Sequence, residues 1–131
     1  MTDLSFKDEI YAIMGACFEV YKDKVCGFVE PVYQECLEIE LAHRGIPFDS
    51  QHELDLFYRD TRLTHSYRPD FICFDKIIIE IKAATMLAAD HRAQVMNYLK
   101  ATGFELGLLV NFDHFPLRES ERIVASTTQR L

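Results

Sequence analysis

Hydrophobic residues recur every three or four positions in three stretches of the chain, a rhythm typical of amphipathic helices. The first stretch covers residues 5–22, and the second covers residues 30–44, where Pro47 prevents continuation. The third covers residues 88–102 and is closed by Gly103. We therefore predict three helices, two before and one after the central part of the chain.

The segments between and after these helices have the alternating or continuous apolar patterns of β-strands. The predicted strands cover residues 48–58, 64–74, 77–82 and 105–112, with a short edge strand at residues 122–125. The order α-α-β-β-β-α-β predicts an α/β (α+β) fold in which a mixed central β-sheet is flanked by helices. No internal repeat or domain boundary is evident, so we expect a single domain over residues 1–131, with its core at about residues 6–124.

Two of the predicted strands carry charged residues where buried strands are normally apolar. Asp70 lies within one strand, and Glu80 and Lys82 close the next. Residues two apart in a strand point the same way, so Glu80 and Lys82 emerge on one face. Asp70 opposes Glu80 only if residues 74–76 form a three-residue turn or a bulge has the same effect, because a two-residue turn reverses its face. We predict the register that brings the two carboxylates together.

Two adjacent carboxylates beside an amine suggest a metal-dependent hydrolytic site. The carboxylates repel each other, and a hard divalent cation relieves that repulsion. Oxygen ligands favour Mg²⁺ or Mn²⁺ over zinc, and such an ion can polarise a phosphoryl oxygen. Lys82 can then orient or deprotonate the attacking water, or stabilise charge on the phosphate. The alternative is an ion pair of Lys82 with Glu80 or Asp70 that only neutralises charge.

Composition and charge set limits on these interpretations. The chain has 131 residues, of which 49% are hydrophobic and 27% charged, as in an ordinary globular domain. Its formal net charge of −7 counts against a protein that coats nucleic acid, but not against an enzyme with a local basic site. No secretion signal or membrane-length apolar run is visible, so we expect a cytoplasmic location. The four cysteines form no C-x-x-C pair, and we expect buried, reduced thiols.

Several motifs resemble those of a known nuclease superfamily. Asp70 with Glu80-Ile81-Lys82 is similar to the PD-(D/E)xK signature of restriction-endonuclease-like nucleases, and Pro69 preserves the proline. More narrowly, residues 27–33, Gly-Phe-Val-Glu-Pro-Val-Tyr, resemble the signature of the GxxExxY proteins. Further similar motifs occupy residues 33–37, 67–70 and 107–112. The resemblance implies a restriction-endonuclease-like core and a Mg- or Mn-dependent phosphodiesterase acting on DNA, or alternatively on RNA.

The resemblance also implies roles for individual residues. Asp70 and Glu80 match the metal-binding carboxylates, and the backbone carbonyl of Ile81 matches a further metal ligand. Lys82 matches the catalytic lysine. Glu30 matches an acidic residue of the first core helix that reaches the metal in related nucleases, and its alternative role is that of a helix cap.

A second motif lies on the third predicted helix. Gln94 and Tyr98 resemble the Q-x-x-x-Y motif of exonuclease-like members and share one helix face. They would position the catalytic lysine, a water or a phosphate. His91 lies on a similar face, and a surface histidine is its alternative interpretation.

Basic residues gather on the hairpin expected around residues 59–62. Arg68 is two residues from Asp70 and is the first candidate for a nucleic-acid contact, followed by Arg62. A solvated hairpin is the alternative for Arg62, as it is for Arg59 and His65. We expect no stacking platform, because the tyrosines fit core or half-buried packing; these are Tyr11, Tyr21, Tyr33 and Tyr58.

Three functions therefore remain open from the sequence. The chain is a nuclease, a non-catalytic interaction module that keeps the nuclease fold, or a hydrolase of a small phosphorylated substrate. Low basicity favours the second, and the intact set of Asp70, Glu80 and Lys82 favours the first and third. A homodimer is compatible with the apolar sheet edges, although no residue identifies its surface.

Overall fold

The computed structural model describes residues 6–113 and 120–124, and it confirms the three predicted helices. The helices are α2 (Lys7–Lys24), α3 (Glu30–His43) and α4 (Ala89–Thr102). Their ends differ from the predicted ones by about one or two residues, as helix ends commonly do. None of these helices is long and apolar enough to cross a membrane.

Five strands form the predicted mixed central sheet, in the order β1-β4-β5-β6-β7. The strands are β1 (Phe48–Ser50), β4 (Phe71–Cys73), β5 (Ile77–Lys82), β6 (Leu106–Asn111) and β7 (Ser120–Val124). β5 and β6 are parallel, because α4 connects them, and the other neighbours are antiparallel. The mixed α+β fold matches the prediction, including the short edge strand near the end of the chain.

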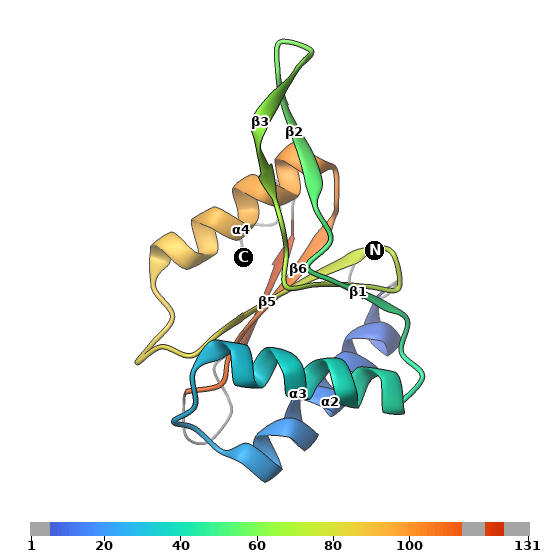
Figure 1. Cartoon of the computed structure of the whole chain (residues 1–131), viewed down its shortest axis with the longest axis vertical. Coiled ribbons are helices and arrows are strands. Elements are labelled where there is room, and N and C mark those ends of the chain that lie inside the picture. Colours follow the sequence, from blue (N-terminus) through green and yellow to red (C-terminus); the bar gives the residue numbers. More distant parts are fainter. Residues whose placement is uncertain (1–5, 114–119, 125–131) are drawn as a thin grey trace.

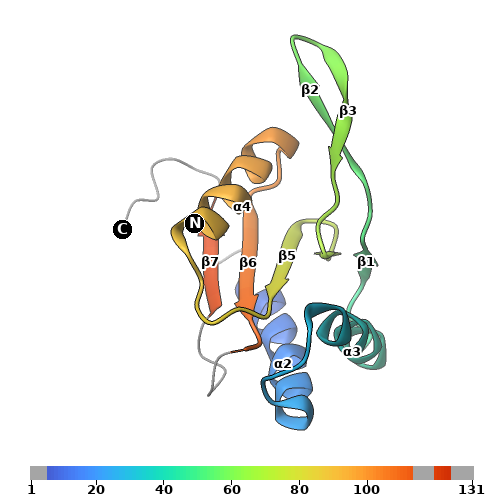
Figure 2. The same ribbon diagram turned by 60° about the vertical axis from the view of Figure 1, so that its left-hand side comes forward.

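Two of the predicted strands were wrong in one respect, because each is broken in the middle. The segment 48–58 divides into β1 and β2 (Leu54–Tyr58), and the segment 64–74 divides into β3 (Thr61–Tyr67) and β4. Gln51 has a left-handed backbone, φ 59°, and Pro69 has no N–H to donate to a ladder. β2 and β3 pair only with each other and extend away from the central sheet in both views (Figures 1 and 2). We call this hairpin, Leu54–Tyr67, the arm.

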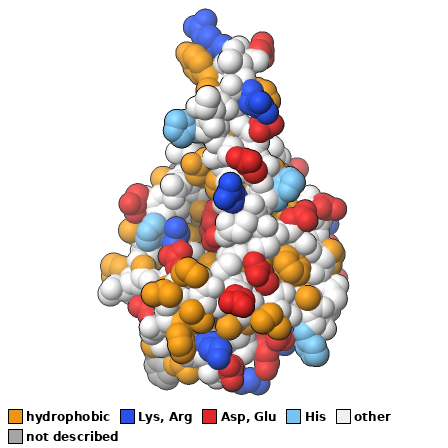
Figure 3. All heavy atoms as spheres, in the orientation of Figure 1, with side chains coloured by type: hydrophobic (Ala, Val, Ile, Leu, Met, Phe, Trp, Pro, Cys, Tyr) orange, Lys and Arg blue, Asp and Glu red, His pale blue; other side chains and the backbone are white. Residues whose placement is uncertain are grey.

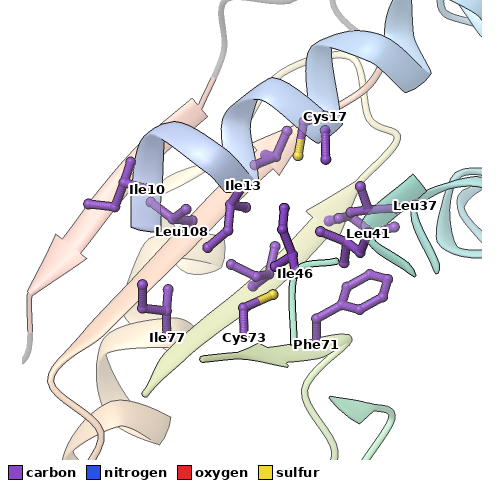
Figure 4. Packing of buried hydrophobic residues seen from close by; sticks show 14 of the residues in the cluster. Ile10, Ile13, Cys17, Leu37, Leu41, Ile46, Phe71, Cys73, Ile77 and Leu108 are labelled. Atoms are coloured by element: carbon purple, nitrogen blue, oxygen red, sulfur yellow. The ribbon is translucent and has the colours of Figure 1, made fainter. Parts of the chain in front are cut away.

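The two faces of the central sheet are covered by different helices. On β5, Ile77, Ile79 and Ile81 face α2 and α3, where they join the larger hydrophobic core (Figure 4). Ile78 faces the other way and packs with Val95 and Leu99 of α4. Side chains alternate along a strand, so Glu80 and Lys82 also emerge on the α4 face.

The turn between β4 and β5 has the register that the candidate site requires. Cys73 pairs with Ile77, and Phe71 pairs with Ile79, so residues 74–76 form the three-residue turn. Phe74 and Asp75 adopt left-handed backbones, φ 57° and 59°, and Lys76 N–H donates to the Cys73 carbonyl at 3.1 Å. This confirms the predicted turn. One step beyond the Phe71–Ile79 pair, the backbone of Asp70 comes opposite Glu80.

All four cysteines are free, as expected, but only two are buried. Cys17 and Cys73 lie in the core, and burial raises the pKa of each thiol to about 12. Cys26 and Cys36 are partly exposed, although both pack against the larger core. The two buried thiols are therefore inert packing groups at neutral pH.

The position of α4 over the sheet depends on a close approach at Gly107. A Cβ atom at Gly107 would lie 3.0 Å from Val95 Cγ1 and 3.6 Å from Leu99 Cδ1. Larger residues on β6 would push α4 outward, and α4 carries two of the candidate site residues, Gln94 and Tyr98.

We expect Gly107→Val to lower the free energy of unfolding by about 1–3 kcal/mol, because the added methyl groups overpack this contact. Denaturant unfolding would measure the change. In a Val95→Ala background, where the nearest contact atom is gone, the same substitution should cost clearly less. Equal costs in the two backgrounds would contradict this account of the α4 contact.

Candidate active site

The candidate site lies just before β4 begins, where, among the described residues, the edge of β5 has no strand beside it. Asp70, just before β4, uses its carboxylate Oδ2 to accept a hydrogen bond from the Ile81 N–H at 2.8 Å. This bond takes the place of the ladder bond that a longer β4 would make. The N–H and C=O of a strand residue face the same neighbour, so the Ile81 carbonyl also faces Asp70.

Asp70 is held from its backbone as well as from its side chain. Its carbonyl accepts hydrogen bonds from Gln51 N–H and from Gln34 Nε2, both at 3.2 Å. Gln34 lies on α3 and also donates to Ser50 Oγ at 3.0 Å. Helix α3 and the end of β1 therefore fix where Asp70 stands. The sequence analysis missed Gln34, although it lies in one of the quoted family-like motifs, residues 33–37.

Glu80 is half-buried beside Asp70, and its protonation reflects that position. Burial raises the pKa of Glu80 to about 8, and the neighbouring Asp70 carboxyl adds to the rise. A hydrogen bond from the Tyr67 hydroxyl and the positive charge of Lys82 act in the opposite direction. The Asp70 carboxyl is thus close enough to Glu80 to disfavour the ionisation of Glu80.

Tyr67 is a site residue that the sequence analysis did not single out. Its ring is buried, its hydroxyl donates to Glu80 Oε2, and burial with the charge of Glu80 raises the pKa of its phenol. The ring stacks on Tyr98, with centroids 3.8 Å apart and planes 3° from parallel. The signal was available, because Tyr67 opens the quoted Tyr67-Arg68-Pro69-Asp70 motif.

Lys82 and the α4 residues share a hollow on one side of Glu80. This hollow has a volume of about 210 Å³. It is lined by Ser66, Tyr67, Arg68, Glu80, Lys82, Gln94, Val95 and Tyr98. Within the described residues, Lys82 forms no ion pair with either site carboxylate. The structure therefore does not support the alternative in which Lys82 serves only to neutralise Glu80 or Asp70.

Glu30 approaches the site from the opposite side. It is half-buried at the first turn of α3, and its carboxylate accepts a hydrogen bond from Ala83 N–H at 3.3 Å. With Asp70 and Ile81 it lines a second hollow, of about 400 Å³. Glu30 thus borders Asp70 but does not enter the hollow that contains Lys82.

The residues around Glu30 explain the spacing of its motif. Gly27 has φ 113°, which glycine adopts without strain, and its N–H donates to Asp113 Oδ1 at 3.0 Å. The buried Tyr33 donates its hydroxyl to the Val25 carbonyl at 2.5 Å and stacks on the Phe112 ring. Glycine and tyrosine together shape the loop that delivers Glu30 to the end of β5.

The donor set suits a hard divalent cation in part. Asp70 and Glu80 supply carboxylate oxygens, and the Ile81 carbonyl faces the same edge, so every available donor is oxygen. Among residues 6–113 and 120–124, however, no three His, Cys, Asp or Glu side chains cluster in a way that could hold an ion. Two carboxylates and a carbonyl leave positions that water or a substrate oxygen fills in Mg²⁺ sites.

Comparison with known proteins identifies the family. A family model of the PD-(D/E)XK nuclease superfamily matches residues 7–123. The chain belongs to this superfamily. No curated protein and no solved structure matches the chain significantly. The match to the PD-(D/E)XK model spans both hollows and every candidate residue named from the sequence.

The remaining candidates are spread over this PD-(D/E)XK fold. Arg68 lines the Lys82 hollow, whereas Arg62 lies out on the arm, 3.9 Å from Asp55. His91 Nδ1 accepts a hydrogen bond from Ala88 N–H at 3.1 Å, so it caps α4. The structure therefore brings Arg68 to the other site residues and leaves Arg62 and His91 apart from them.

The expectation of packed tyrosines was wrong for two of the four. Tyr21 and Tyr33 are buried, but Tyr11 is 82% exposed and Tyr58 is 64% exposed. Tyr58 continues the apolar alternation of β2, yet this part of β2 has left the central sheet, so no core lies beneath it. An alternating apolar pattern in the sequence does not show whether a hairpin packs on the central sheet or extends away from it.

We expect the metal-free chain to lose stability as the pH rises from about 5 to 8. Glu80 has a pKa near 8 in the fold against 4.5 in an ordinary setting, so folding favours its protonated form. The free energy of unfolding should therefore fall with rising pH, by up to about 1.4 kcal/mol per pH unit from this group. Denaturant unfolding at several pH values in EDTA would measure it.

Glu80→Gln, which stays neutral, should remove this contribution from the pH profile. The exposed Glu105 provides a matched control, since Glu105→Gln should leave the slope as in the parent. Parallel profiles for the parent and Glu80→Gln would contradict the raised pKa of Glu80.

Proposed function

We propose that the chain is a metal-dependent nuclease that hydrolyses phosphodiester bonds, with DNA as the favoured substrate and RNA as the alternative. The observation that carries the proposal is the closeness of Asp70 and Glu80 at the open edge of β5, next to the Lys82 amine, which forms no ion pair with either of these two carboxylates. Keeping two carboxylates together raises the free energy of the fold, and function is a usual reason for such a cost. Membership of the nuclease superfamily supports the same reaction.

The proposed ion is Mg²⁺ or Mn²⁺, held by Asp70, Glu80 and the Ile81 carbonyl. Such an ion would polarise a phosphoryl oxygen and favour ionisation of a bound water. Glu30 borders Asp70 from the second hollow and is the candidate for an outer ligand. Tyr67 holds the Glu80 carboxylate by its hydroxyl, and Gln34 holds the backbone of Asp70.

The other residues of the Lys82 hollow have proposed roles that follow from their chemistry. Lys82 orients or deprotonates the attacking water and stabilises charge on the phosphate. Arg68 contacts a phosphate oxygen of the substrate backbone, as guanidinium groups commonly do. Gln94 borders the hollow, and Tyr98 supports Tyr67 by stacking.

We also propose that the chain is one of the GxxExxY proteins. The contacts of Gly27 and Tyr33 support this assignment. The glycine and the tyrosine of the motif both shape the loop that positions Glu30. A motif whose members act on one loop is a more specific signal than scattered identities.

Mn²⁺ or Mg²⁺ should raise the thermal midpoint of the parent by several degrees at saturating concentration, because the ion binds the folded state only. Asp70→Asn and Glu80→Gln should lose most of this shift, and Glu105→Gln should keep it. Differential scanning fluorimetry in EDTA and in each metal would measure the midpoints. A shift retained in Asp70→Asn would contradict the proposed ligands.

Cleavage should depend on the same residues and on Lys82. We expect Glu80→Gln and Lys82→Met to lower the rate by at least about 100-fold, and Glu105→Gln to cleave like the parent. Gel assays with Mg²⁺ or Mn²⁺ on duplex, single-stranded and branched DNA and on RNA would measure the rates. Equal rates in all variants would indicate a contaminant and remove the assignment.

Two other results would replace the nuclease proposal. Metal-dependent hydrolysis of a small phosphodiester without cleavage of any nucleic acid would favour the small-substrate hydrolase. Metal binding and cleavage both absent from the parent would favour the interaction module.

A further inference from the structure

The end of the arm exposes aromatic and apolar side chains that no part of the described chain covers. Phe57 is 62% exposed, Tyr58 is 64% exposed and Leu63 is 41% exposed. Figure 3 shows hydrophobic side chains at the narrow end of the molecule, next to both cationic and acidic ones. Exposed aromatic side chains grouped on a projecting element commonly mark a contact surface.

Only the base of the arm is packed against the rest of the protein. Leu54, Leu56 and Tyr67 join the core beneath α4. Beyond them the hairpin pairs only with itself, and a lone two-stranded hairpin is marginally stable in water. A ligand that covers Phe57 and Tyr58 would therefore stabilise the outer half of the arm.

Charge on the arm differs from that of the rest of the chain. The arm carries two carboxylates, Asp55 and Asp60, and two arginines, Arg59 and Arg62, so it is formally neutral in a chain whose net charge is −7. Arg62 Nη1 lies 3.9 Å from Asp55 Oδ2, and Arg68 adds a further cation just beyond the base of the arm. The arm therefore repels an anionic ligand less than the rest of this acidic chain does.

Arginine and aromatic side chains are also interleaved at the tip. The Arg59 guanidinium lies 5.8 Å from the centre of the Tyr58 ring, and Phe57 pairs across the hairpin with Arg62. Aromatic faces that stack on bases, beside cations that contact phosphates, are typical of surfaces for single-stranded nucleic acid.

The arm continues directly from the candidate active site. Ser66 and Tyr67 at its base line the Lys82 hollow together with the following Arg68, and Thr61 begins the same strand at the far end. The six steps from Thr61 to Tyr67 span roughly 20 Å at about 3.3 Å each. At about 3.4 Å per stacked nucleotide, the tip lies roughly six nucleotides from a phosphate bound at Glu80.

We propose that the arm binds unpaired bases of a nucleic acid whose cleavage point lies in the Lys82 hollow, by stacking on Phe57 and Tyr58. This rests on the proposed nuclease function, and it narrows the substrate to one with a single-stranded part. A fully paired duplex hides its base faces, and a β-ribbon that reads the major groove presents polar side chains to the base edges. The arm presents aromatic side chains instead.

Binding can be tested without cleavage by placing every protein in the Glu80→Gln background. The first probe is a single-stranded 12-nucleotide DNA that carries 2-aminopurine, a base whose fluorescence falls when an aromatic ring stacks on it. The second probe is a fully paired duplex of the same sequence. The arm variant combines Phe57→Ala and Tyr58→Ala. The control is Tyr11→Ala, which removes an even more exposed aromatic side chain, from α2.

We expect the arm variant to bind the single strand at least about tenfold more weakly and to lose the quenching, while Tyr11→Ala binds like the parent. The thermal midpoints of the parent, the arm variant and the control should agree, because Phe57, Tyr58 and Tyr11 are all exposed. Arg59→Ala should lower the dependence of log Kd on log salt by about 0.7, the value for one phosphate contact on a single strand.

Three results would overturn the proposal. These are an unchanged affinity for the single strand in the arm variant, an equal loss of affinity for the duplex, and a self-association of the parent that the arm variant abolishes. Because binding is measured in a background that does not cleave, failure of the parent to cut DNA or RNA would overturn only the proposed function. Unchanged binding in the arm variant would overturn only the role of the arm.

Discussion

The structure of the site depends on one hydrogen bond, from the Ile81 N–H to the Asp70 carboxylate at 2.8 Å. A strand edge without a partner must have its backbone groups satisfied in another way. Here a carboxylate does so, at the point where the chain returns from the arm and β4 begins. The same bond brings Asp70 to Glu80 and aims both at an edge that is open to a ligand.

The arrangement makes sense as a binding site and not as a device for stability. Burial, and next to it the neighbouring Asp70 carboxyl, disfavour ionisation of Glu80 and raise its pKa to about 8. A sequence optimised for stability would place an apolar residue or a close ion pair there. Tyr67 relieves part of the cost through its hydroxyl, and Lys82 lines the same hollow without an ion pair to either site carboxylate. A cation that binds both carboxylates would remove the rest.

Much of the fold was predictable because its signals are local. Apolar periodicity located every helix and the strands β5 and β6, and side-chain parity reduced the register of Asp70 to a choice between two turns. The left-handed backbones of Phe74 and Asp75 produce the three-residue turn. They could not be predicted, because neither position is a glycine or an asparagine. The departure of the arm was less predictable, since the chain leaves the sheet at Gln51, whose left-handed backbone occurs without a glycine.

Tyr67 and Tyr98 show the same limit within the site. Their types and positions were visible, but the stacking that joins them arises only when the arm and α4 fold against the same sheet face. This stacking connects the parts of the site. Tyr98 on α4 packs against Tyr67, and Tyr67 in turn donates a hydrogen bond to the Glu80 carboxylate. Because Tyr67 also ends β3, the residue that orients Glu80 is the same residue that joins the arm to the site.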